Sequence, residues 1–426
     1  MAISGDYIST YTGEQVDEKL ALAGTSLQQG IIKQTTGVST TDLMSQNAIS
    51  TNLYTLSGQI DDLIDGTTTI DKATNADLAT YAYGANFDKI ISTQAEFEAL
   101  IASSTWLGAK SVLFNGKNGE FTLSSANNSG IKIPSTVLNI NGINNATITT
   151  ANGGLWYDTL PTNNEYYIKN LTINSNSYGF SNCINLTNCT GIGENGSTGV
   201  GFSGCKNLIN CIGNGEGSSS GIGFSFCNNL TNCTGTNLNN TSNYAYGFYN
   251  CKNLTNCTGT GYKQGFSHCY KINNCTGIGH IAFSECDYLT NCYGNDENNL
   301  KGFSVCKYLT NCVGVGTDFG FYSCTNLTNC TGTGSFALNS GGGFYYCYQI
   351  SNCIAIGYGG SNTAYGFRNC EQLSCCTGAG VSTENTGYGF EDCSYLSCCK
   401  EGTTGSTTAL WGTGITKRDD DSCQIS

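Results

Sequence analysis

Proline, histidine and charged side chains are scarce in this chain. Its 426 residues include 2 Pro and 2 His, and only 12% of them are charged. So little proline excludes collagen-like and polyproline structure, and two histidines leave little basis for histidine catalysis or a histidine-rich metal site. Because 18 basic residues stand against 31 acidic ones, the net charge of −13 argues against nucleic-acid binding, which requires clustered Lys and Arg.

Long apolar stretches are also missing. No run of 18 apolar residues occurs, so we expect no membrane insertion. Residues 1–6 lack the basic and apolar regions of a secretory signal. We therefore expect a reducing cytoplasm to keep most of the 25 cysteines as thiols that pack as small buried hydrophobic groups. No metal or other cofactor is expected, because Cys-x5-Cys is not a zinc-knuckle spacing and no His accompanies it.

One repeated unit dominates the second half of the chain. From residue 178 to 402 the template Phe-x-x-Cys-x-x-(Leu/Ile)-x-Asn-Cys-x-Gly recurs eleven times, with Cys in place of Asn in the last two repeats and with Ala355 and Glu401 in place of the final Gly in two repeats. Successive Phe residues are 17 to 24 positions apart, and the variation lies in the Gly/Ser/Asn/Tyr-rich segment between units. A fixed segment joined by variable loops is typical of a solenoid, in which equivalent side chains stack on one another.

The composition of the repeat predicts an all-β fold, a parallel β-helix or β-solenoid. Many glycines and few helix formers favour this architecture, in which stacked strands would lie about 4.8 Å apart. The spacing of three between conserved positions predicts very short strands broken by bends, and the Asn column predicts an internal hydrogen-bonded ladder at a turn. The alternative is a leucine-rich-repeat solenoid, although its Ile-x-Ile-Pro continuation is missing. The predicted ladder begins with Phe180, Phe202, Phe224, Phe248, Cys183, Cys189, Cys205, Cys211, Asn188 and Asn210.

The regions on either side of the repeats are predicted to close the β-helix. Thr93 and Glu96 form a capping box that opens a helix over residues 94–102. Short strand-like runs follow up to residue 177, so we assign 91–177 to an N-terminal cap and the first turns. This arrangement resembles the start of a pectate-lyase-like right-handed β-helix, whose helix shields the open edge of the first turn. Residues 403–426 are predicted to cap the other end.

The first 90 residues contain no cysteine and few aromatic residues. Ile49, Leu53, Leu56, Ile60 and Leu63 follow the 4-3-4-3 spacing of a short coiled-coil seam. Alanine then recurs at every third position over residues 73–85, which suits a thin, close-wound neck or a flexible linker. We therefore separate a region over 1–66 from an Ala-periodic segment over 67–90.

Two N-terminal segments resemble a known family. Residues 35–49, TTGVSTTDLMSQNAI, and residues 10–20, TYTGEQVDEKL, are similar to segments of fibre proteins of phages that infect gut Bacteroidales. The cysteine repeats are similar to β-helical repeats of such fibres. The resemblance implies a head or tail fibre, assembled in the bacterial cytoplasm and incorporated into the virion. It also implies that residues 1–66 attach to other virion proteins, and that the chain is a homotrimer.

Within this interpretation the seam residues acquire a role. Leu53, Leu56, Ile60 and Leu63 are assigned to the neck of the trimer, and the distal β-helix would face the host.

Tyrosines in the repeats are the candidate ligand contacts. They lie one or two residues after the first Cys of a repeat, or two residues before it, where we expect exposure. Exposed rings among Asn and Ser can stack on sugars and hydrogen-bond their hydroxyls. The alternative is packing between the chains of a trimer. The predicted contacts with host polysaccharide are Tyr270, Tyr288, Tyr308, Tyr345 and Tyr348.

No catalytic residue is predicted. Three carboxylate pairs were considered, because β-helical phage spikes often cleave glycans with Asp and Glu. None is repeated in neighbouring turns in a way that would build a groove. The sequence therefore predicts a structural, non-enzymatic fibre, and the alternative is a β-helical tailspike depolymerase. The pairs are Glu285 with Asp287, Asp296 with Glu297, and Glu391 with Asp392.

Overall fold

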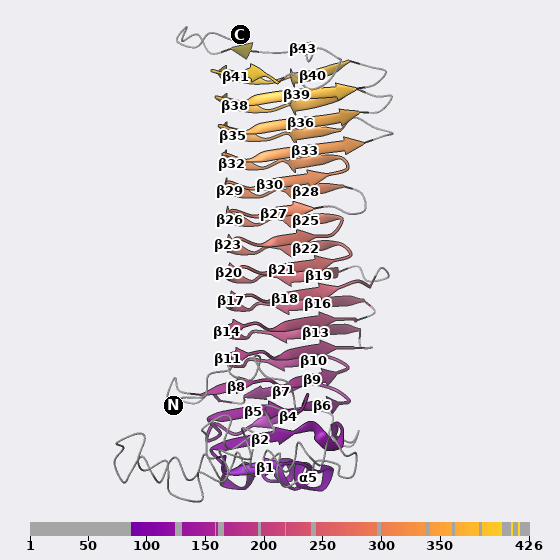
Figure 1. Ribbon diagram of the computed structural model, residues 1–426, viewed down its shortest axis with the longest axis vertical. Coiled ribbons are helices and arrows are strands. Elements are labelled where there is room, and N and C mark those ends of the chain that lie inside the picture. Colours follow the sequence, from indigo (N-terminus) through magenta and orange to yellow (C-terminus); the bar gives the residue numbers. More distant parts are fainter. Residues whose placement is uncertain are drawn as a thin grey trace, which may run out of the picture. The chain divides into compact units, whose positions relative to one another are not determined.

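The computed structural model describes residues 87–417, apart from 124–129, 158, 161–165, 195–196, 218, 240–243, 296–299, 337–340, 360–362, 383–385, 403–409 and 412–415. The predicted attachment region, the seam of Leu53, Leu56, Ile60 and Leu63, and most of the Ala-periodic segment lie outside the described residues. The described part is a stack of turns along one axis, and each turn adds one strand to each of three parallel sheets (Figure 1). The predicted all-β parallel β-helix is confirmed.

We name the sheets A, B and C. Sheet A consists of β1 (Lys89–Ile91), β2 (Ser111–Asn115), β5 (Asn139–Ile143), β8 (Tyr167–Lys169), β11 (Ile184–Thr187), β14 (Lys206–Ile209), β17 (Asn228–Thr231), β20 (Lys252–Thr255), β23 (Tyr270–Asn273), β26 (Asp287–Thr290), β29 (Lys307–Thr310), β32 (Thr325–Thr328), β35 (Tyr348–Ser351), β38 (Glu371–Ser374), β41 (Ser394–Ser397) and β44 (Thr416–Lys417).

Sheet B consists of β3 (Phe121–Leu123), β6 (Thr147–Thr150), β9 (Thr172–Ser175), β12 (Thr190–Gly193), β15 (Ile212–Gly215), β18 (Thr234–Asn237), β21 (Thr258–Gly261), β24 (Thr276–Ile278), β27 (Tyr293–Asn295), β30 (Val313–Gly316), β33 (Thr331–Phe336), β36 (Ile354–Gly359), β39 (Thr377–Ser382) and β42 (Lys400–Glu401).

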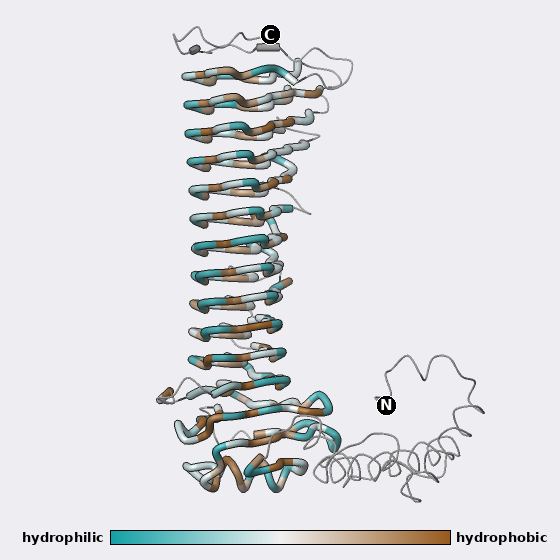
Figure 2. Tube along the Cα trace, turned by 60° about the vertical axis from the view of Figure 1, so that its left-hand side comes forward, coloured by the Kyte–Doolittle hydropathy of each residue, from teal (hydrophilic) through white to brown (hydrophobic). Residues whose placement is uncertain are grey.

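Sheet C consists of β4 (Ile131–Ile133), β7 (Leu155–Tyr157), β10 (Tyr178–Ser181), β13 (Thr198–Ser203), β16 (Ser220–Ser225), β19 (Tyr244–Tyr249), β22 (Gln264–Ser267), β25 (Ile281–Ser284), β28 (Lys301–Ser304), β31 (Phe319–Tyr322), β34 (Gly342–Tyr345), β37 (Ala364–Arg368), β40 (Gly387–Glu391) and β43 (Leu410–Trp411). Figure 2 shows the repeat turns as similar coils stacked along the rod.

Stacked side chains fill the core along the whole repeat region. Phe248 and Phe266 are fully buried, and their ring centroids lie 4.7 Å apart with planes only 4° from parallel. The Phe residues of all eleven repeats continue this stack, with Phe180 5.0 Å from Phe202 at one end and Phe367 5.1 Å from Phe390 at the other. Offset-stacked rings at this distance attract one another beyond the hydrophobic contribution of burial.

The chain bends sharply at every third residue of the conserved segment. Asn182, Asn185 and Asn188 have φ values of 51°, 57° and 52°, and the corresponding residues of most later repeats also have positive φ. Asparagine tolerates this left-handed conformation better than most residues. The bends turn the chain from sheet C to sheet A and from sheet A to sheet B. They explain why the conserved residues recur every three positions and not every two.

The asparagine column forms a ladder, but on the outside of the rod. The side-chain amide of Asn210 donates to Oδ1 of Asn188 at 3.2 Å, and both side chains are exposed. Similar bonds join Asn141 through Asn274 and, separately, Asn291 through Asn329. The prediction of an internal ladder was wrong, because the left-handed residue at the corner directs its side chain to solvent and the following Cys points inward.

The paired cysteines are buried thiols. Of the 23 free cysteines among the described residues, 22 are buried and Cys375 is exposed. Sγ of Cys183 donates to the carbonyl of Ser181 at 3.4 Å, and Sγ of Cys189 donates to the carbonyl of Thr187 at 3.4 Å. Each of these thiols therefore gives a weak additional hydrogen bond to a carbonyl beside a bend, which an alanine could not make. Burial raises the pKa of the Cys183 thiol.

Two columns of glycine bring sheets B and C together, and the sequence analysis found only one of them. A Cβ on Gly191 would lie 2.3 Å from the carbonyl oxygen of Gly201, and a Cβ on Gly179 would lie 2.7 Å from Cα of Gly191. The glycine that precedes ten of the eleven Phe residues (Ala282 precedes Phe283), missed in the template, is therefore as necessary as the one after the second Cys. The helix is thin where these backbones meet.

Both ends of the described rod carry closing elements. Helix α5 (Gln94–Ala102) has the predicted capping box and buries Phe97 and Leu100 against the first turn. The 3-10 turns η2 (Trp106–Gly108) and η3 (Gly116–Asn118) complete this end. At the other end β43 pairs with β40 and β44 pairs with β41, which adds backbone pairing beyond the last repeat.

Candidate binding surfaces

Three of the five predicted tyrosines form a row on the outside of sheet A. Tyr270 begins β23, and Tyr288 and Tyr308 are the second residues of β26 and β29, where φ is 60° and 58°. Their exposed fractions are 36%, 45% and 46%. The centroids of Tyr288 and Tyr308 lie 4.6 Å apart at an interplanar angle of 14°, and Tyr270 meets Tyr288 edge-on at 5.1 Å and 71°. We call these residues the tyrosine row.

The stacking in the tyrosine row limits how it can meet a ligand. Because Tyr288 and Tyr308 face each other, each has one ring face covered by its neighbour. The row therefore offers ring edges and hydroxyl groups along the rod, together with Nζ of Lys271, which lies 5.5 Å from the Tyr270 ring. Such a surface can hydrogen-bond a polyhydroxylated ligand at several successive turns.

The other two predicted tyrosines lie elsewhere. Tyr348 is half-buried in β35, where it pairs with Thr325 and Glu371. Tyr345 lies on sheet C, also half-buried, and stacks on Phe319 at 4.6 Å and 8°. The prediction that all these tyrosines are exposed was therefore wrong for Tyr345 and Tyr348.

Tyr345 belongs to an aromatic cluster on sheet C that the sequence analysis did not identify. Nζ of Lys301 lies 3.5 Å from the centroid of Tyr322, and burial lowers the pKa of Lys301. Phe319 lies over Gly342, where a Cβ would come within 3.2 Å of the ring. The signal in the sequence was the position of these residues, two before or one after the ladder Phe, where side chains point outward.

The cluster ends in an ion pair. The guanidinium of Arg368 lies 4.3 Å from the ring of Tyr365 and 5.7 Å from that of Tyr345, and its Nε is 3.1 Å from Oε2 of Glu391. Burial raises the pKa of Glu391, and the charge of Arg368 opposes that shift. The cations and rings of this cluster mainly satisfy one another.

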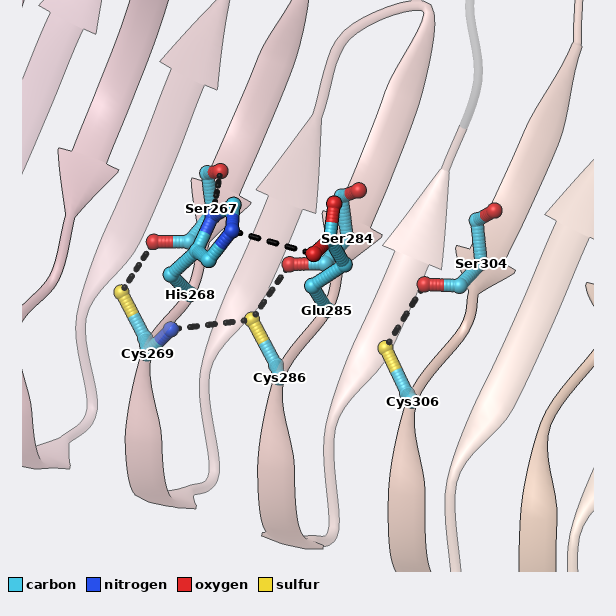
Figure 3. A network of polar contacts seen from close by, with 8 residues as sticks. All are labelled: Ser267, His268, Cys269, Ser284, Glu285, Cys286, Ser304 and Cys306. Atoms are coloured by element: carbon cyan, nitrogen blue, oxygen red, sulfur yellow. Dashed lines mark hydrogen bonds and ion pairs between the residues drawn. The ribbon is translucent and has the colours of Figure 1, made fainter.

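A Ser–His–Glu contact chain lies at a corner between sheets C and A (Figure 3). Oγ of Ser267 is 2.9 Å from Nδ1 of His268, and Nε2 of His268 is 3.0 Å from Oε2 of Glu285. The order of groups is that of a nucleophile, base and acid. However, Ser267 is only 1% exposed, so a substrate in solvent cannot reach its hydroxyl. We interpret the contacts as support for two left-handed corner residues.

The carboxylate pairs do not assemble a hydrolytic site in the part of the chain that the structure describes. Glu285 is paired with His268 and Glu391 with Arg368. Asp296 and Glu297 lie outside the described residues. A glycosidase requires one carboxylic acid and one carboxylate that both face the substrate, and each described glutamate of these pairs is instead bound to a basic side chain.

A small cleft lies beside the N-terminal cap. Its volume is about 240 Å³, and it is lined by Ile101, Ser103, Ser104, Trp106, Leu123, Gly130, Ile131 and Lys132. Lys132 is its only ionisable side chain, so the cleft lacks the acid and base of a hydrolytic site.

Among residues 87–417, outside the gaps given above, no three or more His, Cys, Asp or Glu side chains are grouped so that they could hold a metal ion. No helix in the same segments has the length and apolar character needed to cross a bilayer.

Comparisons with known proteins give distant likenesses in structure only. No family model and no curated protein matches the chain. The A-module of mannuronan C-5 epimerase AlgE6 from Azotobacter vinelandii is similar with a TM-score of 0.34 and 13% identity, over 76% of this chain and 93% of that one.

Two further solved structures are similar at 11% identity. Tailspike protein 3 of bacteriophage CBA120 has a TM-score of 0.24 over 87% of this chain and 66% of that one. The Streptococcus pneumoniae surface adhesin PfbA has a TM-score of 0.24 over 71% of this chain and 87% of that one. At such scores and identities these likenesses carry no argument about function.

Proposed function

We propose that this chain is a trimeric fibre protein of a bacteriophage particle that binds host-surface polysaccharide without cleaving it. The particle is the proposed location because residues 10–20 and 35–49 resemble phage fibre segments. The observation that carries the binding role is the tyrosine row, with Tyr288 and Tyr308 stacked and nearly half exposed on consecutive turns.

The rod shape of the described repeats supports this role. A rod of stacked turns holds its outer side chains at a constant spacing, about 4.8 Å from turn to turn. A polysaccharide is itself a repeating chain, so it can meet equivalent hydroxyl and amide groups on successive turns. Weak contacts of this kind add up when several are made at once.

Binding to purified capsular polysaccharides of gut Bacteroidales tests the proposal. Changing Tyr288→Ser and Tyr308→Ser together should weaken binding about tenfold or more, which corresponds to roughly 1.4 kcal/mol. Tyr395→Ser is the matched control, because Tyr395 occupies the same left-handed column with 50% exposure but lies outside the row. Equal binding by the double variant and the control would contradict the role of the row.

The alternative is a depolymerase. The fold is the only feature that suggests it, and this is weak support because unrelated activities share one fold. Incubating the full chain with the polysaccharide that it binds separates the two. Release of reducing ends or unsaturated sugars would establish cleavage and overturn the non-enzymatic part of the proposal.

A further inference from the structure

The strands of sheet B are free of charged residues along almost the entire length of the sheet. Two carboxylates from segments beside the strands reach its outer face, where Glu120 accepts a hydrogen bond from Thr149 and Glu216 accepts one from Asn214. The twelve consecutive strands from β6 to β39 contain no Asp, Glu, Lys, Arg or His. Their residues point alternately into the core and outward, and the outward ones are mostly Thr, Ile, Val and Asn. The first outward column consists of Thr147, Thr172, Thr190, Ile212, Thr234, Thr258, Thr276, Tyr293, Val313, Thr331, Ile354 and Thr377.

Large apolar side chains in this column are unusually open to solvent. Ile212, Val313 and Ile354 have exposed fractions of 49%, 37% and 46%. The sheet runs along the full stack of repeats, so these side chains lie on one continuous strip (Figure 1). An extended, uncharged strip of β-branched residues is typical of a protein interface and not of a surface that only faces water.

The other two sheets differ from sheet B. Strands of sheet A carry outward charges such as Lys252, Asp287 and Lys307, and strands of sheet C carry Lys301 and Arg368. All three sheets belong to the same turns, so the repeat does not itself forbid charge. The absence of charged residues from the strands is specific to sheet B.

We propose that the outer face of sheet B is the surface through which copies of this chain pack side by side, with their rods parallel. In a closed assembly around an axis parallel to the rods, each turn meets the same turn of its neighbour. A charge on the contact face would then meet an identical charge at the same height. Because each chain has a net charge of −13, only a face without charges can be brought together at low cost.

The size of the face fits a second copy of the chain. Twelve strands spaced by 4.8 Å give a strip about 55 Å long, and three to four residues make it roughly 12 Å wide, or on the order of 700 Å². A stable interface buries about 800 Å² on each partner. A partner that stays in register over such a length must have the same repeat, and another copy of this rod has it.

Paired lysine substitutions on two adjacent turns test the face against a matched control. Thr234→Lys with Thr258→Lys alters sheet B, and Thr231→Lys with Thr255→Lys makes the same change on sheet A of the same turns. All four threonines are half-buried. Sedimentation equilibrium of the full-length chain should give a multiple of 45.0 kDa for the natural protein and the control.

The sheet B variant should lose mass toward that of one chain at low salt and regain it as salt screens the lysines. A natural protein that is monomeric at all concentrations would overturn the proposal. The N-terminal region could hold the chains together independently of sheet B, so mass is not the only measurement.

Cross-linking decides in that case. In a background in which Cys375, Cys398 and Cys423 are changed to Ser, Thr258→Cys introduces a thiol on the proposed contact and Thr255→Cys introduces one on sheet A. Sheets that pack face to face lie about 10 Å apart, so a bis-maleimide of that span should join chains through the first thiol and not through the second. Failure to join chains at position 258, or equal joining at both positions, overturns the proposal whatever the mass.

This proposal rests on the oligomeric part of the proposed function, for which it names the contact face, and it does not depend on glycan binding. The tyrosine row lies on sheet A, so the lysine variants of sheet B leave it unaltered. Loss of cross-linking with retained polysaccharide binding would refute the interface alone. Normal cross-linking without polysaccharide binding would refute only the binding role.

Discussion

Gly259→Ala tests the principle on which the thin core is built. Gly259 belongs to the column after the second Cys of each repeat, and its backbone is not left-handed, so only space restricts a side chain there. An added Cβ would lie 2.6 Å from the carbonyl oxygen of Gly265, 2.8 Å from Cε2 of Phe266 and 2.9 Å from Cδ2 of Phe248. All three distances are shorter than a van der Waals contact, so the rings or the backbone must move.

A natural variation shows how the stack responds. Ala355 occupies the equivalent position of its own repeat, beside Phe344 and Phe367. These two rings are inclined by 25°, whereas Phe248 and Phe266 are inclined by 4°. The largest ring angle of the ladder therefore occurs in the repeat that carries this methyl group, which is consistent with accommodation by tilting. We expect the same tilt in Gly259→Ala, with an overpacking cost of about 1–3 kcal/mol.

The free energy must be measured locally, because each turn contacts only its neighbours and a solenoid need not unfold in one step. Hydrogen exchange of the amides of β21 and β22 should become roughly 5- to 150-fold faster, the range that corresponds to 1–3 kcal/mol. Thr258→Ala is the control, since it truncates the neighbouring outward side chain and should change stability by about 0.5 kcal/mol or less. Exchange in Gly259→Ala that equals the control would refute the close-packing argument.

Three further predictions concern the corner, the thiols and the cap. Asn232→Ala should destabilise its turn by about 1–2 kcal/mol, because Ala disfavours a φ of 53° and the ladder hydrogen bonds are lost. Asn232→Gly should recover the part of this cost that comes from the backbone conformation, and local hydrogen exchange would measure both changes. Cys375 should react with iodoacetamide in the native protein, whereas Cys251 should react only in denaturant, because it is buried and burial raises its pKa. Peptide mass spectrometry distinguishes the two sites, and labelling of Cys251 in the native protein would contradict its burial. Oδ2 of Asp88 accepts a hydrogen bond of 2.7 Å from the backbone N–H of Lys110, and such bonds lower the pKa of Asp88 below its ordinary value of 3.8. The stabilisation of the folded state by the Asp88 carboxylate is therefore complete above pH 3.8 and is lost as the pH falls through the lower pKa of Asp88 in the folded state. Asp88→Asn should remove this pH dependence from the protease resistance of the cap. An acid transition that is the same in the variant would count against the prediction.

The sequence by itself determined the stack. Eleven units with invariant Phe, two Cys and Leu or Ile at spacings of three can bury those residues only if turns lie over one another, and the structure places Phe248 on Phe266 accordingly. The capping box at Thr93 likewise specified the start of α5, because it depends on neighbours in the chain. These features were predictable because they depend on residues that lie close together in the chain, either within one repeat or at the start of the helix.

The tertiary structure decided which side chains reach solvent and which of them meet. A bend at every third residue removes the simple alternation of a strand, so Tyr345 and Tyr348 became half-buried while Tyr288 and Tyr308 became an exposed stack. The same bends turned the asparagine ladder outward. The role of the glycine that precedes ten of the eleven Phe residues became clear only when sheets B and C were placed against each other. Close approach of two backbones is a property of the assembled cross-section and not of either segment alone.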